Sequence, residues 1–252
     1  MTATPVLRTE RLSRRFGGLN AVSDVSLSIP EGQTVGVIGP NGAGKSTLIN
    51  LVTGHLKPSS GRVLIDGKDL TGARPWVITH AGVARTFQIV KPFRGMTVLE
   101  NVAIGILYGP HGVRRMSHAR TAAATVLEET DLGHLAERAP GELSVADARR
   151  LEFAKALALR PRLVLLDEVM AGLRHREIES SLELIRTLKA RGITIVVVEH
   201  VMRAILAVSD RVVVLHHGKV LTEGRPREVL SDPQVVEAYL GHRYAQRRAG
   251  DS

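Results

Sequence analysis

The sequence predicts an α/β fold, in which buried strands of a parallel sheet alternate with helices. The β-branched run Thr34 to Ile38 precedes a glycine-rich turn and an apolar segment that can continue as a helix. Two further apolar runs, Leu163 to Leu166 and Ile193 to Val198, lie on either side of a segment with helical spacing, Arg176 to Ala190. Helical spacing dominates from about Thr97 to Leu159. These observations predict a sheet core with a helical lobe inserted after about residue 88.

The chain opens with two half-exposed strands. Apolar and polar residues alternate over Leu7 to Phe16 and over Ala21 to Ile29, and Gly17-Gly18 supplies a turn between them. Turn-bounded strands are also expected at Gly61 to Gly67 and at Val83 to Phe87.

The inserted lobe contains three expected helices. Thr97-Val98-Leu99-Glu100 is a capping box with Thr97 at the N-cap. Helices are expected over His118 to Glu129 and over Ser144 to Leu159. A further strand is predicted at Arg211 to Leu215, after which the polar tail, 245–252, is expected to fray.

Composition favours an ordinary globular protein. Of 252 residues, 44% are hydrophobic and 23% charged, which suffices for a sizeable core. The longest apolar runs fall far below the roughly 18 residues of a membrane-spanning helix, and the N-terminus has no apolar segment typical of a secretion signal. The sequence contains no cysteine, which excludes disulfides, zinc–thiolate sites and thiol nucleophiles and fits a reducing cytosolic setting.

The net charge of +9 has two interpretations. Lysines and arginines occur in scattered pairs without interleaved aromatic residues, which favours a solvated basic surface. Contact with an anionic membrane face or an acidic partner is the alternative.

Nine consecutive residues match the phosphate-binding pattern G-x-x-x-x-G-K-S/T between a predicted strand and a predicted helix. They are Gly39, Pro40, Asn41, Gly42, Ala43, Gly44, Lys45, Ser46 and Thr47. Glycines allow successive backbone N–H groups to point at one anion, and the helix N-terminus adds a favourable dipole. Lys45 would reach the β and γ phosphates and Ser46 would hold Mg²⁺. The sequence therefore predicts a nucleoside triphosphate site.

Two acidic residues supply what hydrolysis further requires. Asp167 and Glu168 follow the buried strand Leu163 to Leu166. Asp167 would bind the metal, and Glu168 would act as general base for the attacking water. Two acids at a strand end would by themselves indicate only a loop, but the phosphate loop favours the catalytic interpretation.

Two other polar residues follow predicted strands. His200 comes after Ile193 to Val198, and Gln88 comes after Val83 to Phe87. Ligands bind at the carboxyl ends of parallel strands, so both residues are expected near the phosphate loop. Gln88 is placed to touch Mg²⁺ or water, although by itself this signal is weak.

These motifs, in this order, resemble the nucleotide-binding subunit of ABC transporters over nearly the whole chain. The resemblance implies a P-loop NTPase with a RecA-like mixed-sheet core, an antiparallel β subdomain and an inserted α-helical subdomain. The expected domain spans residues 7–244. Its core and β subdomain comprise 7–92 and 160–244, and its helical subdomain comprises 93–159.

The resemblance also implies roles for single residues. Phe16 looks like the aromatic residue that stacks on adenine, although an ordinary strand-end residue is the alternative. Gln88 looks like the glutamine that couples the nucleotide site to the membrane subunits. His200 looks like the histidine that contacts the γ-phosphate.

Two longer segments are similar to the branched-chain amino-acid importers, and to the longer of their two ATPase subunits. They are Arg85 to Val102, and the C-terminal stretch from Val208 to Leu215 with Glu237 to Gly241. This similarity implies an ATPase, using ATP and Mg²⁺, that energises uptake of branched-chain amino acids or a related small polar solute. Urea or amides are alternative solutes. An ABC ATPase acting on nucleic acid is disfavoured, because the chain has no long coiled-coil insertion and no second phosphate loop.

The implied partners are two permease subunits, a second ATPase subunit and, indirectly, an extracytoplasmic solute-binding protein. Nucleic acid is not an expected partner. The implied location is peripheral, on the cytoplasmic face of the inner membrane.

The sequence departs from the family pattern at the LSGGQ-type signature, which meets the partner's nucleotide. Ser144 is retained to bind the γ-phosphate, whereas Ala146 replaces glycine and Asp147 replaces glutamine. Ala146 keeps its N–H but adds a Cβ. The helix dipole attracts Asp147 by about 0.3–1 kcal/mol, and a phosphate would repel it by roughly 0.7–3 kcal/mol. These two ranges overlap, so they do not set the sign of the net effect. Val169 and Arg174 are further departures, at positions usually held by proline and by an acid or asparagine.

These departures favour an asymmetric transporter with two different ATPase subunits. A subfamily variant that is fully active at both sites is the alternative.

Overall fold

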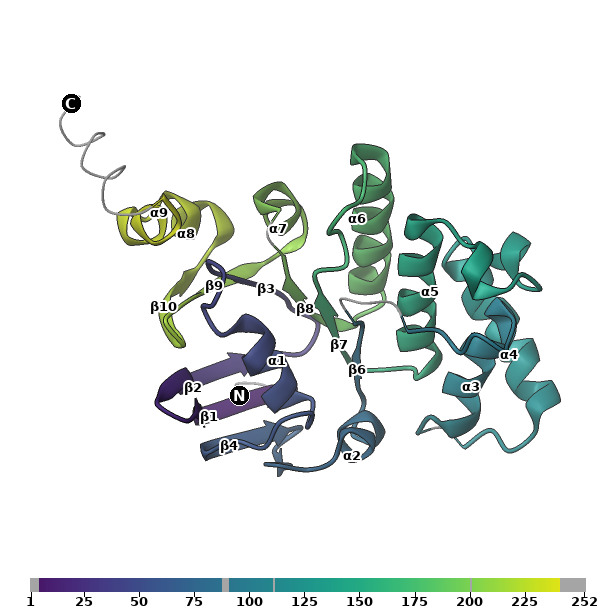
Figure 1. Cartoon of the computed structure of the whole chain (residues 1–252), viewed down its shortest axis with the longest axis horizontal. Coiled ribbons are helices and arrows are strands. Elements are labelled where there is room, and N and C mark those ends of the chain that lie inside the picture. Colours follow the sequence, from purple (N-terminus) through teal and green to yellow (C-terminus); the bar gives the residue numbers. More distant parts are fainter. Residues whose placement is uncertain (1–4, 88–90, 111, 200, 241–252) are drawn as a thin grey trace.

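The computed structural model describes residues 5–87, 91–110, 112–199 and 201–240. They form two sheets, with helices around the larger sheet and a separate group of helices at one end (Figure 1). The sheets lie one above the other in this view, and helix α1 (Lys45–Val52) lies between them.

The smaller sheet is antiparallel and four-stranded, in the order β2-β1-β4-β5. Its strands are β1 (Leu7–Phe16), β2 (Leu19–Ile29), β4 (Ser60–Ile65) and β5 (Lys68–Asp69). The alternation in the sequence sets its register: Leu7 pairs with Ile29 and with Ile65, and all three are buried on the face toward the larger sheet.

The larger sheet has six strands in the order β10-β9-β3-β8-β7-β6. These are β3 (Thr34–Ile38), β6 (Val83–Arg85), β7 (Leu163–Asp167), β8 (Thr194–Val198), β9 (Arg211–His216) and β10 (Lys219–Gly224). All pairings are parallel except that of β9 with β10. The carboxyl ends of β3, β7 and β8 therefore meet at one edge, as the sequence predicts.

Both faces of this sheet are buried, which explains its continuous apolar runs. Leu163 and Leu165 pack with the antiparallel sheet and α1, whereas Val164 and Leu166 pack with the helices on the opposite face. Those helices are α6 (His175–Ala190), α7 (Met202–Val208), α8 (Pro226–Ser231) and α9 (Pro233–Leu240).

The helices at the end of the molecule form their own core. They are α3 (Val98–Tyr108), α4 (Met116–Glu129) and α5 (Val145–Ala158), with short 3-10 turns at Gly133–Leu135 and Pro140–Glu142. Val102, Leu127 and Leu151 are fully buried between them. The predicted capping box of α3 is present, since the Thr97 hydroxyl and the Glu100 carboxylate each accept a backbone N–H.

The predicted α/β fold with an inserted helical lobe is confirmed, and most elements agree within one to three residues. The strand expected at Val83 to Phe87 ends at Arg85, because the β6 pairing with β7 stops there. The elements that sequence reasoning did not identify include β10, α7 and α2 (Pro75–His80). These elements are short, and a periodic pattern needs more residues to be visible.

Truncation of Leu151 tests the independence of the helical core. Leu151→Ala should destabilise the protein by about 2–5 kcal/mol, because it leaves a cavity between α3, α4 and α5. Val145→Ala, on the same helix but 66% exposed, is the matched control and should change stability by less than about 0.5 kcal/mol. Urea unfolding measures both, and equal effects would contradict this packing.

Candidate nucleotide site

The phosphate loop connects β3 to α1 and is held tightly by neighbouring backbone. Gly44, the N-cap of α1, has φ 103°, and a Cβ there would collide with the carbonyl oxygen of Ala21. Gly39 has φ 153°, and a Cβ there would collide with the carbonyl oxygen of Leu215. Two of the pattern's glycines are therefore required both by backbone conformation and by space.

Lys45 is almost fully buried at the start of α1. Its Nζ donates to the carbonyl oxygens of Gly39, at 2.7 Å, and Pro40, at 3.1 Å. Burial lowers the pKa of the Lys45 ammonium, whereas the carboxylates of Glu168 and Asp167 act to raise it. The ammonium is thus held within the loop, next to two acids.

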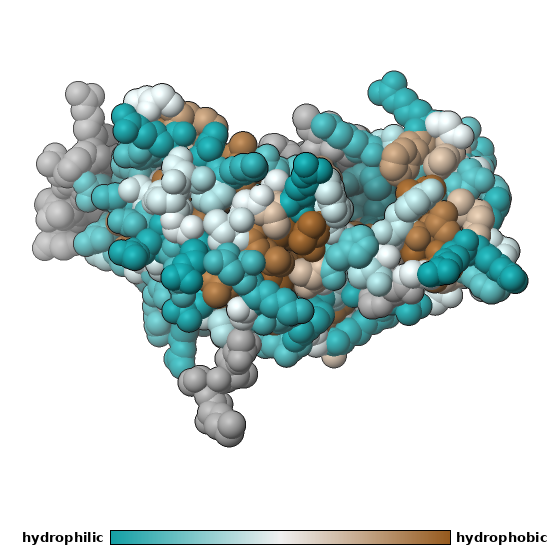
Figure 2. Space-filling model, turned by 90° about the horizontal axis from the view of Figure 1, so that it is seen from below, coloured by the Kyte–Doolittle hydropathy of each residue, from teal (hydrophilic) through white to brown (hydrophobic). Residues whose placement is uncertain are grey.

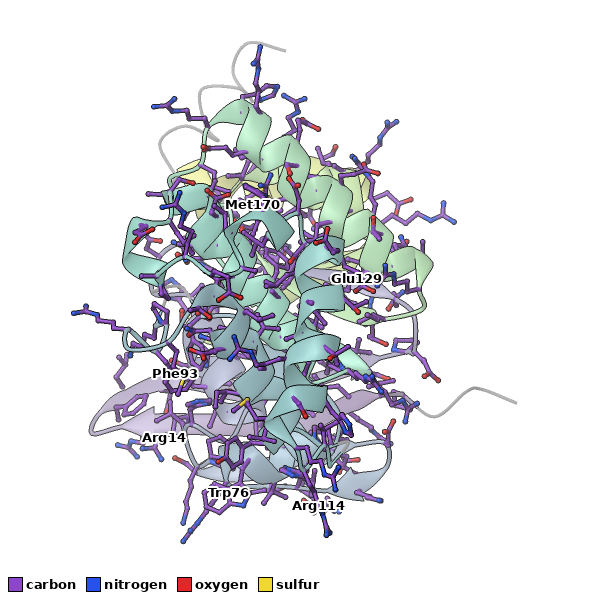
Figure 3. The ribbon with its side chains drawn as sticks, turned by 90° about the vertical axis from the view of Figure 1, so that its right-hand side faces the viewer. Arg14, Trp76, Phe93, Arg114, Glu129 and Met170 are labelled. Carbon is purple, nitrogen blue, oxygen red and sulfur yellow. The ribbon has the colours of Figure 1, made fainter. Side chains whose placement is uncertain are left out.

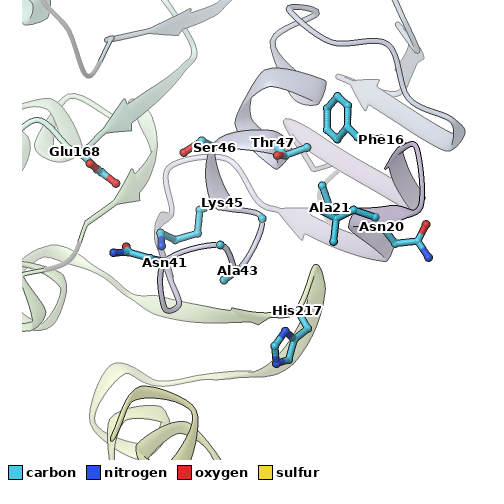
Figure 4. Close-up of a pocket in the computed structure, with 13 residues that line it drawn as sticks. Phe16, Asn20, Ala21, Asn41, Ala43, Lys45, Ser46, Thr47, Glu168 and His217 are labelled. Carbon is cyan, nitrogen blue, oxygen red and sulfur yellow. The ribbon is translucent and has the colours of Figure 1, made fainter. Parts of the chain in front are cut away.

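A pocket of about 440 Å³ opens over this loop (Figure 4). Its walls come from the phosphate loop, the first two strands, the end of β7 and the β9–β10 turn. The lining residues are Phe16, Leu19, Asn20, Ala21, Asn41, Gly42, Ala43, Gly44, Lys45, Ser46, Thr47, Glu168 and His217. This volume falls in the range of small-molecule sites.

Phe16 stands at one end of this pocket, as the sequence predicts. It is the last residue of β1, is 43% exposed, and has the Arg14 guanidinium 4.7 Å from its ring centroid. An exposed aromatic face beside a phosphate loop offers a stacking surface for a base.

Asp167 ends β7 in a buried ion pair that the sequence analysis missed. Its Oδ2 lies 2.8 Å from Nη2 of Arg85, and both side chains are at most 10% exposed. Nη1 of Arg85 also donates to Oδ1 of Asn50 at 2.6 Å, on α1. One buried arginine therefore joins the β7 carboxylate to the helix that follows the phosphate loop. The sequence feature that could have revealed this pair is Arg85 itself, a charged residue at the end of the short apolar strand β6, which lies next to β7.

Glu168 follows Asp167 and lines the pocket opposite Phe16 (Figure 4). Its φ of 51° is in the left-handed region, which is strained for a glutamate. Its N–H donates to the Val198 carbonyl at 2.9 Å, so β8 holds this turn. Such strain is concentrated at functional sites.

Gln88 and His200 lie outside the described residues. The described residues next to them in the chain are Phe87, two residues after β6, and Glu199, directly after β8. The Glu199 carboxylate accepts the N–H of Met170 at 2.8 Å.

Ser144 and Ala146 lie at the start of α5 and do not line this pocket. Ser144 is the N-cap: its Oγ accepts the Asp147 N–H at 3.1 Å and donates to Oδ2 of Asp147 at 2.6 Å. Arg150 reaches Oδ1 of Asp147 at 3.4 Å. The hydroxyl proton and the carboxylate are thus engaged within this chain.

The segment after Glu168 is packed inward. Val169 and Met170 are each 1% exposed. Arg174, by contrast, is exposed and is the N-cap of α6, where its N–H donates to the Glu177 carboxylate at 2.6 Å. Val169, which stands where the family usually has proline, is therefore part of the hydrophobic core.

Comparison with known proteins decides the family. The ABC transporter family model matches residues 22–171, from β2 through the turn after β7. The chain belongs to the ABC transporter family. A second model, described as branched-chain amino acid ATP-binding cassette transporter, matches residues 219–245.

Several relatives of this ABC protein match over nearly their full length. The high-affinity branched-chain amino acid transport ATP-binding protein BraF of Pseudomonas aeruginosa is 38% identical, over 94% of this chain and 98% of its own. LivG proteins of Salmonella typhimurium and Escherichia coli K12 are 40% and 39% identical, with the same coverage.

Solved structures agree with this assignment. A crystal structure of an ATP-binding cassette of an ABC transporter in its ADP conformation matches with a TM-score of 0.85 and 37% identity. The match covers 94% of this chain and 99% of that one. A nucleotide-free cassette matches with a TM-score of 0.84 and 36% identity, covering 94% of this chain and all of that one.

The ABC chain therefore has the fold of an ATP-binding cassette, the family that binds ATP and hydrolyses it to drive transport through membrane partners. Across the described part of the chain, every helix is too short or too polar to cross a bilayer. The predicted family, fold and ATPase activity are confirmed.

Removal of Arg85 tests the ion pair at Asp167. Arg85→Ala should lower the free energy of unfolding by about 3–5 kcal/mol, because it leaves a buried carboxylate without its cation. The double variant Arg85→Met with Asp167→Leu should lose less, since neither charge is then left unpaired.

Arg203→Ala is the control, because it removes an exposed pair with Glu179 and should cost at most about 1 kcal/mol. Urea unfolding gives all three values. A loss for Arg85→Ala no greater than this control would contradict a structural role for the pair.

Proposed function

We propose that this ABC protein energises an importer of branched-chain amino acids. The observation that carries the proposal is the match of residues 219–245 to the branched-chain amino acid cassette model. This segment includes all of β10 together with α8 and α9. It lies outside the phosphate loop, so the match does not depend on the residues that every nucleotide-binding cassette needs. Urea, amides or another small polar solute is the alternative cargo, because the membrane and solute-binding subunits select the solute.

The proposed ATP site uses the pocket over the phosphate loop. Phe16 stacks on the base, and residues 39–47 surround the phosphates with their backbone N–H groups and Lys45. The pocket volume, the exposed ring and the buried ammonium support this assignment. Glu168, which faces the pocket, serves as the general base for water.

The proposed metal is Mg²⁺, held by Ser46 and Asp167. A hydroxyl and a carboxylate are the hard oxygen ligands that this ion prefers, which supports the fit. The buried guanidinium of Arg85 orients the carboxylate, since it is bonded to one of its two oxygens. Gln88 as a further ligand and His200 at the γ-phosphate are retained as proposals from the family resemblance.

The proposed domain organisation divides this chain into two parts. Residues 7–92 and 160–244 form the catalytic core with the β subdomain, and residues 93–159 form the helical subdomain. The separate core of α3, α4 and α5 supports the second boundary. We place the protein peripherally at the cytoplasmic face of the inner membrane, on two permease subunits that an extracytoplasmic binding protein supplies with solute.

One side of the molecule supports a permease contact. Seen from below, the surface is mostly hydrophilic, with apolar side chains gathered in patches (Figure 2). Trp76, on α2, is 55% exposed and Phe93 is 50% exposed. Trp76 and Arg114 both lie toward the lower edge in Figure 3. Exposed aromatic residues of this kind are enriched at protein interfaces.

The partner ATPase is proposed to be a different chain. The Ser144 hydroxyl donates a hydrogen bond to the Asp147 carboxylate, and Asp147 lies in the first turn of α5. A phosphate arriving there meets a negative charge and an occupied hydroxyl. An asymmetric pair would confine this weakness to the nucleotide of the partner, while this chain's own phosphate loop meets the partner's signature.

Uptake by the reconstituted transporter tests the proposed function. In proteoliposomes containing the permeases, both ATPases and the binding protein, ATP should drive leucine uptake in preference to urea. Glu168→Gln should retain ATP binding but lower turnover at its site by about 100-fold to 10,000-fold, because the general base is lost. Lys45→Ala should weaken ATP binding itself. Urea uptake without leucine uptake would replace the proposed cargo, and unchanged turnover in Glu168→Gln would contradict the base.

Restoration of the family residues tests the asymmetric pair. Ala146→Gly with Asp147→Gln in the assembled complex should raise the ATPase rate or shorten retention of the partner's nucleotide, because it removes a Cβ and a like charge. Asp131→Asn, which removes an acid that also pairs with Arg150 but lies outside the signature, is the control. An unchanged rate together with unchanged nucleotide retention would contradict a weakened site.

A further inference from the structure

The turn between β9 and β10 is fastened to the phosphate loop. The Gly218 N–H donates to the Ala43 carbonyl at 3.0 Å, and the Gly218 carbonyl accepts the Ser23 N–H at 2.8 Å. A Cβ on Gly218 would lie 2.8 Å from the Ala21 carbonyl oxygen. The turn is therefore wedged between the phosphate loop and β2, and whatever it presents to the pocket is held in place.

This turn presents His217. The residue has φ 48°, a left-handed conformation that is unfavourable for a side chain bearing a Cβ. Its imidazole is exposed and is one of the residues that line the pocket (Figure 4). The preceding His216 does not line the pocket. Its ring centroid lies 4.0 Å from that of His217, and burial together with His217 lowers the pKa of His216.

His217 lies at the end of the pocket formed by the phosphate loop, away from Phe16. Figure 4 shows its ring on the side of Ala43, whereas Phe16 stands on the opposite side, beyond Thr47. The hydrogen bond from the Gly218 N–H to the Ala43 carbonyl holds the residue after His217 directly against the phosphate loop. Among the described lining residues, only Lys45 and His217 can carry a positive charge.

We propose that His217 is a nucleotide-binding residue that donates a hydrogen bond to the polyphosphate of the bound nucleotide. An imidazole N–H is a suitable donor for phosphate oxygens, and the rigid turn limits the entropy lost when it binds. The inference deepens the proposed function, because it rests on the ATP site over the phosphate loop. It adds the C-terminal hairpin to a site that the phosphate-loop motif alone does not predict.

Nucleotide affinity as a function of phosphate number tests this role. His217→Gly is the informative variant, because glycine adopts the left-handed conformation without strain and has no side-chain donor, whereas an asparagine amide could replace the imidazole N–H. Isothermal titration of the full chain should show ATP binding weakened about threefold to tenfold, the size of one hydrogen bond. The affinity for AMP, whose single phosphate does not extend along the loop, should change by less than twofold.

His134→Ala is the matched control, since His134 is an exposed histidine of the helical lobe outside the pocket. It should leave ATP and AMP binding unchanged. Thermal unfolding of the His217→Gly variant should give a midpoint that is not lowered, which separates contact with the ligand from loss of folding.

Two results would overturn the inference. Equal weakening of ATP and AMP would place His217 against the base or ribose, and unchanged ATP affinity would leave it without a role in binding. Wild-type and Lys45→Ala proteins distinguish these from failure of the proposed function. If wild type binds ATP and Lys45→Ala does not, the site stands whatever His217 does, whereas absence of ATP binding by wild type would reject the site itself.

Discussion

The close approach of backbone to backbone around the phosphate loop is the constraint on which the site depends. Gly39 meets Leu215, Gly44 meets Ala21, and the carbonyl of Ala43 is bonded to the β9–β10 turn. These contacts bring three distant parts of the chain against one loop, so the larger sheet, the antiparallel sheet and the C-terminal hairpin must all be in place before the pocket exists. The loop is therefore held by the whole fold, and its anion-binding N–H groups are preorganised.

The charges around Asp167, which precedes the pocket-lining residue Glu168, are also held by contacts between separate elements. Arg85 pairs with Asp167 in a nearly solvent-free position and also bonds to α1. A buried ion pair contributes less to stability than to geometry, because desolvation of both charges offsets most of their attraction. Its effect here is to hold the carboxylate at a set distance from the phosphate-loop helix. Lys45, buried beside the same acids, completes a site whose charges are largely balanced within the chain.

The start of α5 differs from the phosphate loop, because its side chains form hydrogen bonds with one another without a ligand. Ser144, Asp147 and Arg150 form a closed set of contacts around a helix N-terminus. A helix N-terminus with vacant donors attracts an anion, whereas this one already carries its own carboxylate. The two segments thus differ in kind: the phosphate loop lines an open pocket, whereas the start of α5 is capped by its own side chains.

The sequence by itself determined the elements whose chemistry is local: the nine-residue phosphate loop, the capping box at Thr97, the buried strand ending in Asp167, and the family. Each depends on residues close in the chain, so their spacing is visible in the text. Only the tertiary structure decided which distant residues complete the site. Arg85, Asn20 and His217 reach it because parallel strands align their ends and a hairpin folds back on the loop. The hydrogen bond between Ser23 and Gly218 joins residues 195 positions apart in the chain, and packing rather than spacing brings them together.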